Sequence, residues 1–147
     1  TKVLEQVVIR PERELVEKLQ LRAKEKVFKI VRLRYLNNEP NHIVTTFLPI
    51  KLFPGIERHD FSQGSLYTLL REKYGAQLAR ARFVVEATSA GDDEARLLNF
   101  QPKGPLLLIY SQVFNPEGNP IIYGFSRIRA DQGQVEFEII AHEAIGR

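Results

Sequence analysis

The chain has 147 residues, the length of one ordinary domain, and its 44% hydrophobic and 27% charged residues are enough for both a packed core and a solvated surface. It has no cysteine, which excludes disulfides and thiolate metal sites, and no run of about 18 apolar residues, which argues against a membrane-spanning helix. The net charge of +3 comes from scattered lysines and arginines, so we do not expect this segment to bind nucleic acid directly.

The first residues, TKVLEQVVIRPERE, are charged throughout and lack the apolar stretch of a signal peptide. Together with the absence of cysteine, this favours a cytoplasmic protein. The chain begins at Thr1 and contains no methionine, so we expect it to be a fragment of a longer protein or a processed product.

In chain order, three segments have the spacing or capping residues of helices: 11–20, 65–74 and 92–99. Pro11 suits a first helical position, Gly75 suits the position after a helix end, and Asp92 suits an N-cap followed by acids in the first turn.

Six segments have the β-branched, aromatic or alternating composition of strands: 27–36, 42–48, 79–90, 105–114, 120–129 and 134–141. The turn sequences NNEPN and NPEGN each join two of them as hairpins. Because hairpins pair their strands antiparallel, we predict an α+β fold with an antiparallel sheet of about six strands and helices packed on one face.

Two arginines are the first candidates for a binding site. Arg32 and Arg34 are two apart on a predicted strand, so both leave the same face, beside Phe28, Ile30 and Leu36. Two guanidinium groups next to an apolar stripe could clamp an anion with paired hydrogen bonds. The alternative is an exposed strand end where both arginines face water.

Ser65 begins a predicted helix, whose free backbone N–H groups and partial positive charge favour a phosphate or carboxylate. The alternative, and the commoner role of serine at this place, is simply an N-cap. Ser62 is a second candidate cap, so the helix start is uncertain by a few residues.

The strand 120–129 carries a glycine in its interior. Ile122, Gly124, Ser126 and Ile128 share one of its faces. A glycine inside a strand often marks the close approach of another group, and the interpretation we favour is tight packing against a helix.

No constellation of catalytic or metal-binding residues is recognisable. The three histidines, His42, His59 and His142, lack metal-ligand spacing, and we expect each at the surface or at a strand end. No GxSxG, Walker or GxGxxG motif is present. We therefore predict no catalytic residues, no metal site and no cofactor.

Four segments resemble, in the right order, the effector-binding (UTRA) domain of HutC-type regulators in the GntR superfamily: RLRYLNNEPNHIVTTFLP, SLYTLLREKYG, RARFVVEATSAGDDEARLLNF and GPLLLIYSQVFNPEGNPIIYGFSRIRAD. The resemblance covers nearly the whole chain, so we predict one UTRA domain over residues 1–147. It implies a chorismate-lyase-like fold, a homodimer and a small-molecule effector. It also implies an N-terminal winged helix-turn-helix domain, expected outside this chain, that binds operator DNA.

Position by position, the resemblance implies that Arg32, Arg34 and Ser65 lie near an anionic group of the effector. Phosphosugar-sensing members have two acids and a tyrosine at three positions that are apolar here: Val44, Ile122 and Ile128. Because leaving sugar hydroxyls unpaired in a pocket costs about 1–3 kcal/mol each, we expect an effector with an anionic head and an otherwise less polar body.

Two other functions stay open at this point. A lyase-type enzyme could use the same fold, although no matched acid–base pair is apparent. A dimerisation module without a ligand is the other alternative. The hypothesis we prefer is ligand-gated transcription control, in which an effector shifts DNA binding by favouring one dimer arrangement.

Overall fold

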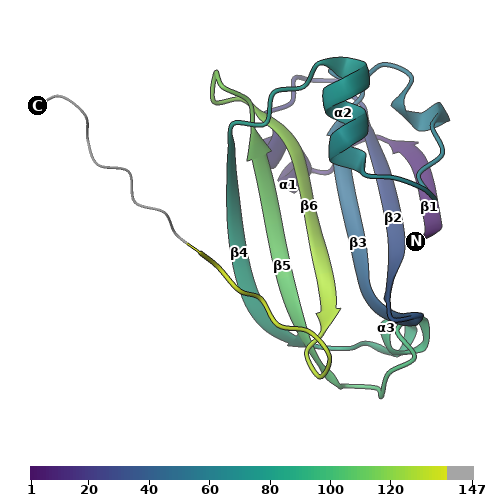
Figure 1. Cartoon of the computed structure of the whole chain (residues 1–147). Helices are drawn as coiled ribbons and strands as arrows, with labels where there is room; N and C mark the ends of the chain where they lie inside the picture. Colours follow the sequence, from purple (N-terminus) through teal and green to yellow (C-terminus); the bar gives the residue numbers. More distant parts are fainter. Residues whose placement is uncertain (139–147) are drawn as a thin grey trace, which may run out of the picture.

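The computed structural model describes residues 1–138, which form one six-stranded antiparallel sheet with three α-helices and a short 3₁₀ helix (Figure 1). The strands are β1 (Lys2–Ile9), β2 (Val27–Leu36), β3 (Glu39–Pro49), β4 (Arg80–Ser89), β5 (Pro105–Phe114) and β6 (Pro120–Arg129). The helices are α1 (Arg13–Leu19), η1 (Ile56–Arg58), α2 (Leu66–Tyr74) and α3 (Asp92–Leu97). The predicted α+β class and antiparallel sheet are confirmed.

Both predicted hairpins are present, β2 with β3 and β5 with β6. The first turn contains Asn37 and Asn38 with φ values of 50° and 64°, a left-handed conformation that asparagine tolerates better than most residues. The two hairpins meet where β3 pairs with β6, giving the strand order β1-β2-β3-β6-β5-β4.

The strands at the two ends of the chain differ from the prediction. β1 was not predicted, because its valines and charged residues do not alternate regularly. It forms an edge of the sheet, where it pairs antiparallel with β2. The predicted strand at 134–141 is wrong over residues 134–138, which have no strand structure, and residues 139–141 lie outside the described residues. An alternating pattern forms a strand only where it pairs with a neighbour, and 134–138 pair with neither edge of this sheet.

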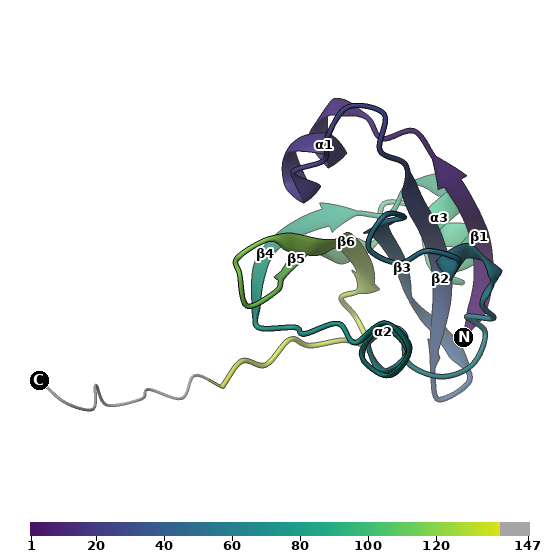
Figure 2. The same ribbon diagram turned by 90° about the horizontal axis from the view of Figure 1, so that it is seen from above.

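The helices cover both faces of the sheet, not one as predicted (Figure 2). On one face α2 packs with Leu66 and Leu70 in a cluster that contains Phe28 and Ile30 of β2. On the other face α1 packs against Val27, while α3 packs with Leu33 and Ile43. Since adjacent strand residues point to opposite faces, one strand supplies core side chains to both layers.

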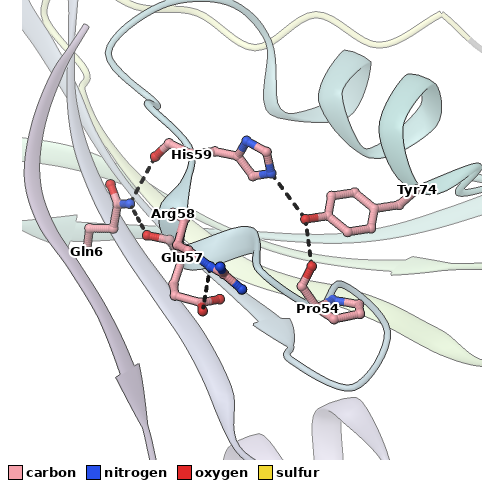
Figure 3. Close-up of polar contacts among 6 residues, drawn as sticks. All are labelled: Gln6, Pro54, Glu57, Arg58, His59 and Tyr74. Atoms are coloured by element: carbon pink, nitrogen blue, oxygen red, sulfur yellow. Dashed lines mark hydrogen bonds and ion pairs between the residues drawn. The ribbon is translucent and has the colours of Figure 1, made fainter.

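A set of polar contacts fixes α2 over its face of the sheet (Figure 3). The Tyr74 hydroxyl at the end of α2 donates to the Pro54 carbonyl oxygen at 3.1 Å and lies 3.2 Å from His59 Nε2. Gln6 Nε2 of β1 donates to the carbonyl oxygens of Glu57 and His59 at 2.7 and 3.0 Å. The sheet edge, the η1 segment and α2 are thereby linked.

Within residues 1–138, no helix combines the length and apolar composition that crossing a bilayer requires.

Candidate functional site

A cavity of about 290 Å³ lies on the α2 face of the sheet. Its walls come from β2, β3, β4, β5 and β6, and from the first turn of α2. The strand positions that line it are mostly alternate ones, such as Arg32 and Arg34 of β2 or Ser126 and Ile128 of β6, because only alternate side chains face one side of a sheet.

Five of the six predicted site residues line this one cavity: Arg32, Arg34, Val44, Ile122 and Ile128. They come from three strands that are adjacent in the sheet order, β2, β3 and β6. The register explains their meeting, since Arg32 pairs with Val44 across β2 and β3, and Val44 pairs with Ser126 of β6.

The sixth predicted residue, Ser65, is the N-cap of α2 and does not line the cavity. Its hydroxyl oxygen accepts a hydrogen bond from the Thr68 backbone N–H at 3.4 Å. The next two residues of the helix, Leu66 and Tyr67, do line the cavity. The first residues of α2 therefore line the same cavity as the two arginines, while the Ser65 hydroxyl is occupied in capping.

Arg32 is buried, and no acidic side chain among residues 1–138 neutralises its charge. Its side chain is 6% exposed, its Nε has no hydrogen-bond partner, and no acid among residues 1–138 forms an ion pair with it. Burial, and secondly the nearby Arg34 charge, lower the pKa of Arg32 below its ordinary value. A buried unpaired charge is unfavourable, so this guanidinium is a site where an anion would be stabilised.

The other buried arginine, Arg129, has hydrogen-bond partners for its guanidinium within the chain. Arg129 is 7% exposed, and its Nη2 donates to Asp131 at 2.8 Å while its Nη1 donates to the Leu98 carbonyl oxygen at 3.1 Å. The hydrogen bond to Asp131 raises the pKa of Arg129, opposite to the shift at Arg32. Within residues 1–138, Arg129 thus has carboxylate and carbonyl partners, and Arg32 has none of that kind.

Two further titratable residues line the cavity and were not identified as site residues from the sequence. His42 was expected at a surface or strand end, but it lies within β3, half-buried, two residues before Val44 and opposite Arg34. Tyr67 reaches the cavity from α2, where burial raises the pKa of its hydroxyl and the Arg32 charge partly opposes the increase. The alternation His42–Val44 was the signal that could have found the histidine.

The remaining wall is mixed in polarity. Phe83 and Ile109 add apolar surface to the predicted isoleucines and valine, while Ser111 and Ser126 add two hydroxyls. No carboxylate lines the cavity among residues 1–138. The site therefore offers cations and hydroxyls to a ligand, but no acidic group that could act as a base or hold a metal.

Gly124 lies under the cavity, where β6 comes very close to β3. A Cβ atom at this position would be 2.4 Å from the Thr45 carbonyl oxygen, too close for any side chain. The close approach predicted for this glycine is confirmed, but the group that approaches is the main chain of a neighbouring strand and not a helix. The reason is that Gly124 pairs with Thr46 in the middle of the sheet.

The family model of the UTRA domain matches residues 1–134 of this chain. Among curated proteins, the chain is 28% identical over 132 residues to the HTH-type transcriptional regulator GmuR of Bacillus subtilis, covering 90% of this chain and 55% of GmuR. It is 27% identical over 106 residues to the HTH-type transcriptional repressor NagR of the same organism, covering 72% of this chain and 43% of NagR. The chain thus spans about half the length of these relatives.

Solved structures share the fold. A crystal structure from Bordetella bronchiseptica, described as the ligand-binding domain of a GntR-family transcriptional regulator, has a TM-score of 0.88 and 27% identity, covering 95% of this chain and 89% of that one. The effector domain of PhnF from Mycobacterium smegmatis has a TM-score of 0.86 and 20% identity, covering 97% and 86%. At 20% identity the likeness to PhnF is one of fold alone.

Proposed function

We propose, since this chain belongs to the UTRA domain family, that it is the ligand-sensing and dimerisation part of a GntR-family, HutC-type transcription regulator, most simply a repressor. A small anionic metabolite would bind in the cavity and change operator binding by a separate winged helix-turn-helix domain of the longer protein. Such a regulator would act in the cytoplasm.

The observation that carries this proposal is the buried, unpaired Arg32 beside Arg34 in the cavity. A guanidinium pair is suited to anions that present two or more acceptor oxygens, such as carboxylate, phosphate or sulfonate groups. Ser65 is proposed to contribute through the helix start that it caps, where the partial positive charge of the first turn favours an anion. Val44, Ile122 and Ile128 would contact the less polar body of the effector.

An enzymatic role is less well supported by this site. The cavity has a possible proton acceptor in His42, but no carboxylate among the described residues lines the cavity to pair with it as a second acid–base group. The relatives with printed functions are regulators and repressors. We therefore propose that the effector is bound and released unchanged.

The homodimer is proposed to form through β4, the edge strand next to β5. All ten of its residues are exposed, among them the apolar Phe83, Val84 and Val85. Monomeric proteins usually protect an edge strand with charges, bulges or a covering loop. Because Phe83 also lines the cavity, a bound effector would lie next to this contact and could favour one arrangement of the two copies.

The proposed effector site is tested with benzenesulfonate, a permanently charged anion with a small apolar body. We expect it to raise the midpoint of thermal unfolding of the wild type, and the Arg32→Ala/Arg34→Ala variant to lose this stabilisation, because the anion would have no guanidinium partner. Arg71→Ala on α2, outside the cavity, should respond as the wild type does.

Arg32→Met adds a second readout. Because it removes a buried charge, the free protein should be at least as stable as the wild type, while its stabilisation by benzenesulfonate should be lost. A normal response in the double variant would show that the proposed site is wrong.

The proposed dimer contact is tested by placing charges on β4. Val84→Glu together with Val85→Glu should shift the chain from a dimer to a monomer of 16.9 kDa in light scattering, because four carboxylates would meet at the interface. Val7→Glu on β1, the opposite edge, is the matched control and should remain dimeric. Dimers of unchanged stability in the β4 variant would rule out this contact.

A further inference from the structure

We propose that His42 is a third cationic contact for the anionic group of the effector, and that effector binding is coupled to protonation of this histidine, so that affinity rises as the pH falls. This inference rests on the proposed effector site. It adds a regulatory property, proton-coupled binding, that the two arginines alone cannot provide because they keep their charge throughout the physiological pH range.

The register of the sheet brings His42 to the anion site. His42 pairs directly with Arg34 of β2 on one side and with Ile128 of β6 on the other. It lines the same cavity as both arginines, and its side chain is half-buried. An anion held by Arg32 and Arg34 in a cavity of about 290 Å³ would therefore be close to the imidazole.

The charged and titratable groups facing this cavity are all cations or neutral at pH 7. β2 contributes Arg32 and Arg34, and α2 contributes Tyr67. The residues that β4, β5 and β6 contribute carry hydroxyls or apolar groups, including Phe83 and Ser111. Without a ligand, no described carboxylate in the cavity can stabilise an imidazolium there.

The hydrogen bonding of the ring indicates which nitrogen would take up the proton. His42 Nδ1 lies 3.0 Å from the Asn41 carboxamide oxygen. In the tautomer that carries its hydrogen on Nδ1, the ring donates to this oxygen, and Nε2 is the nitrogen left to be protonated. Protonation there creates a second N–H donor, the kind of group that a carboxylate, phosphate or sulfonate would accept from.

The free site holds His42 in the neutral state. Burial, and then the charges of Arg34 and Arg32, lower the pKa of His42 below its ordinary value. An anion between these groups would counter both arginine charges and favour the imidazolium, so the pKa would be higher in the complex than in the free protein. The extra affinity is therefore fully present below the free-state pKa and is lost as the pH rises through the pKa of the complex.

The experiment measures benzenesulfonate binding by calorimetry from pH 5.5 to 8, in buffers of different ionisation enthalpy. The charge of this probe does not change over the range, so any pH dependence belongs to the protein. We expect binding about three- to tenfold tighter at pH 5.5 than at pH 8, since a rise of one pKa unit on binding gives up to about tenfold. Proton uptake should pass through a maximum of about 0.3–0.5 proton per site between the two pKa values, which is what a three- to tenfold change in affinity requires.

His42→Gln should bind without proton uptake and with little pH dependence. His59→Gln is the matched control, because His59 contacts Tyr74 outside the cavity, and its pH dependence should equal that of the wild type (Figure 3). The His42 ring resonances, followed by NMR in free and probe-saturated protein, should titrate at higher pH in the complex.

The outcomes separate this inference from the proposed function. Binding that depends on Arg32 and Arg34 but is equally tight from pH 5.5 to 8 overturns the role of His42 and leaves the effector site intact. Proton uptake that persists in His42→Gln also overturns it. Absence of binding at every pH, or binding that does not require the arginines, overturns the effector site and with it the role of His42.

Discussion

Replacing Gly124 by alanine is expected to reduce the free energy of unfolding by about 3 kcal/mol, and replacing it by valine by more. The added Cβ would lie 2.4 Å from the Thr45 carbonyl oxygen and 3.3 Å from the Thr46 Cα. Both atoms belong to the main chain of β3 in the centre of the sheet, where a side-chain rotation cannot relieve the overlap. The two central strands would have to move apart, which would weaken the pairing that joins the two hairpins.

Urea denaturation followed by circular dichroism measures this effect. Gly91→Ala is the matched control, because a Cβ there would meet only the Glu94 carboxylate at 3.8 Å, and we expect a change below about 1 kcal/mol. Gly124→Ala should also weaken benzenesulfonate binding, since Thr45, Thr46 and Ser126 around this position line the cavity. A Gly124→Ala protein as stable as the wild type would mean that β3 and β6 are not held this closely in solution.

The same region shows what the sequence could predict about the site. Side chains alternate along a strand, so Arg32 with Arg34, and Ile122 with Ile128, were placed on common faces without knowledge of the fold. That these faces meet in one cavity depends on the order and register of three strands, which span nearly a hundred residues of chain. The family resemblance supplied this step, and the geometry agrees with it.

The residues that the sequence did not identify share a physical cause. His42 resembled an isolated histidine, because its neighbour Arg34 is on another strand and only the register brings them together. β1 was missed because an edge strand has one pairing partner and a largely exposed surface, so its apolar pattern is weak. Conversely, the regular alternation at 134–138 has no pairing partner among the described strands.

The second large effect is expected at Arg129, whose replacement by alanine should reduce the free energy of unfolding by about 2–3 kcal/mol. Besides its bonds to Asp131 and the Leu98 carbonyl oxygen, its Nη1 donates to the Asn99 carbonyl oxygen at 3.3 Å, and its guanidinium lies over the Phe100 ring at 4.6 Å. These contacts fix the end of α3 and the segment after it against the end of β6. Without the guanidinium, the carbonyl oxygens would lose their donor in a buried position.

An exposed arginine on α3, the helix that Arg129 holds, gives the contrast. Arg96 forms an ion pair with Asp93 in which both side chains are more than three-quarters exposed, so Arg96→Ala should change stability by less than about 1 kcal/mol. Arg129→Lys should recover only part of the loss, because an ammonium cannot donate to Asp131 and to two carbonyl oxygens in the planar arrangement of a guanidinium.

The pH dependence offers an independent check on the Arg129 effect. The hydrogen bond from Arg129 lowers the pKa of Asp131 below its ordinary value. A carboxylate whose pKa is lower in the folded state stabilises the protein above its unfolded-state pKa, and this contribution is lost as the pH falls through the folded-state pKa. The difference in unfolding free energy between the wild type and Arg129→Ala should therefore narrow below about pH 4. A constant difference down to pH 2 would show that the carbonyl contacts carry the whole effect. Arg129 and Arg32 then represent two kinds of buried guanidinium in one sheet: Arg129 is paired within the chain and holds α3, whereas Arg32 has no acid partner among residues 1–138 and is proposed to bind an anion from outside.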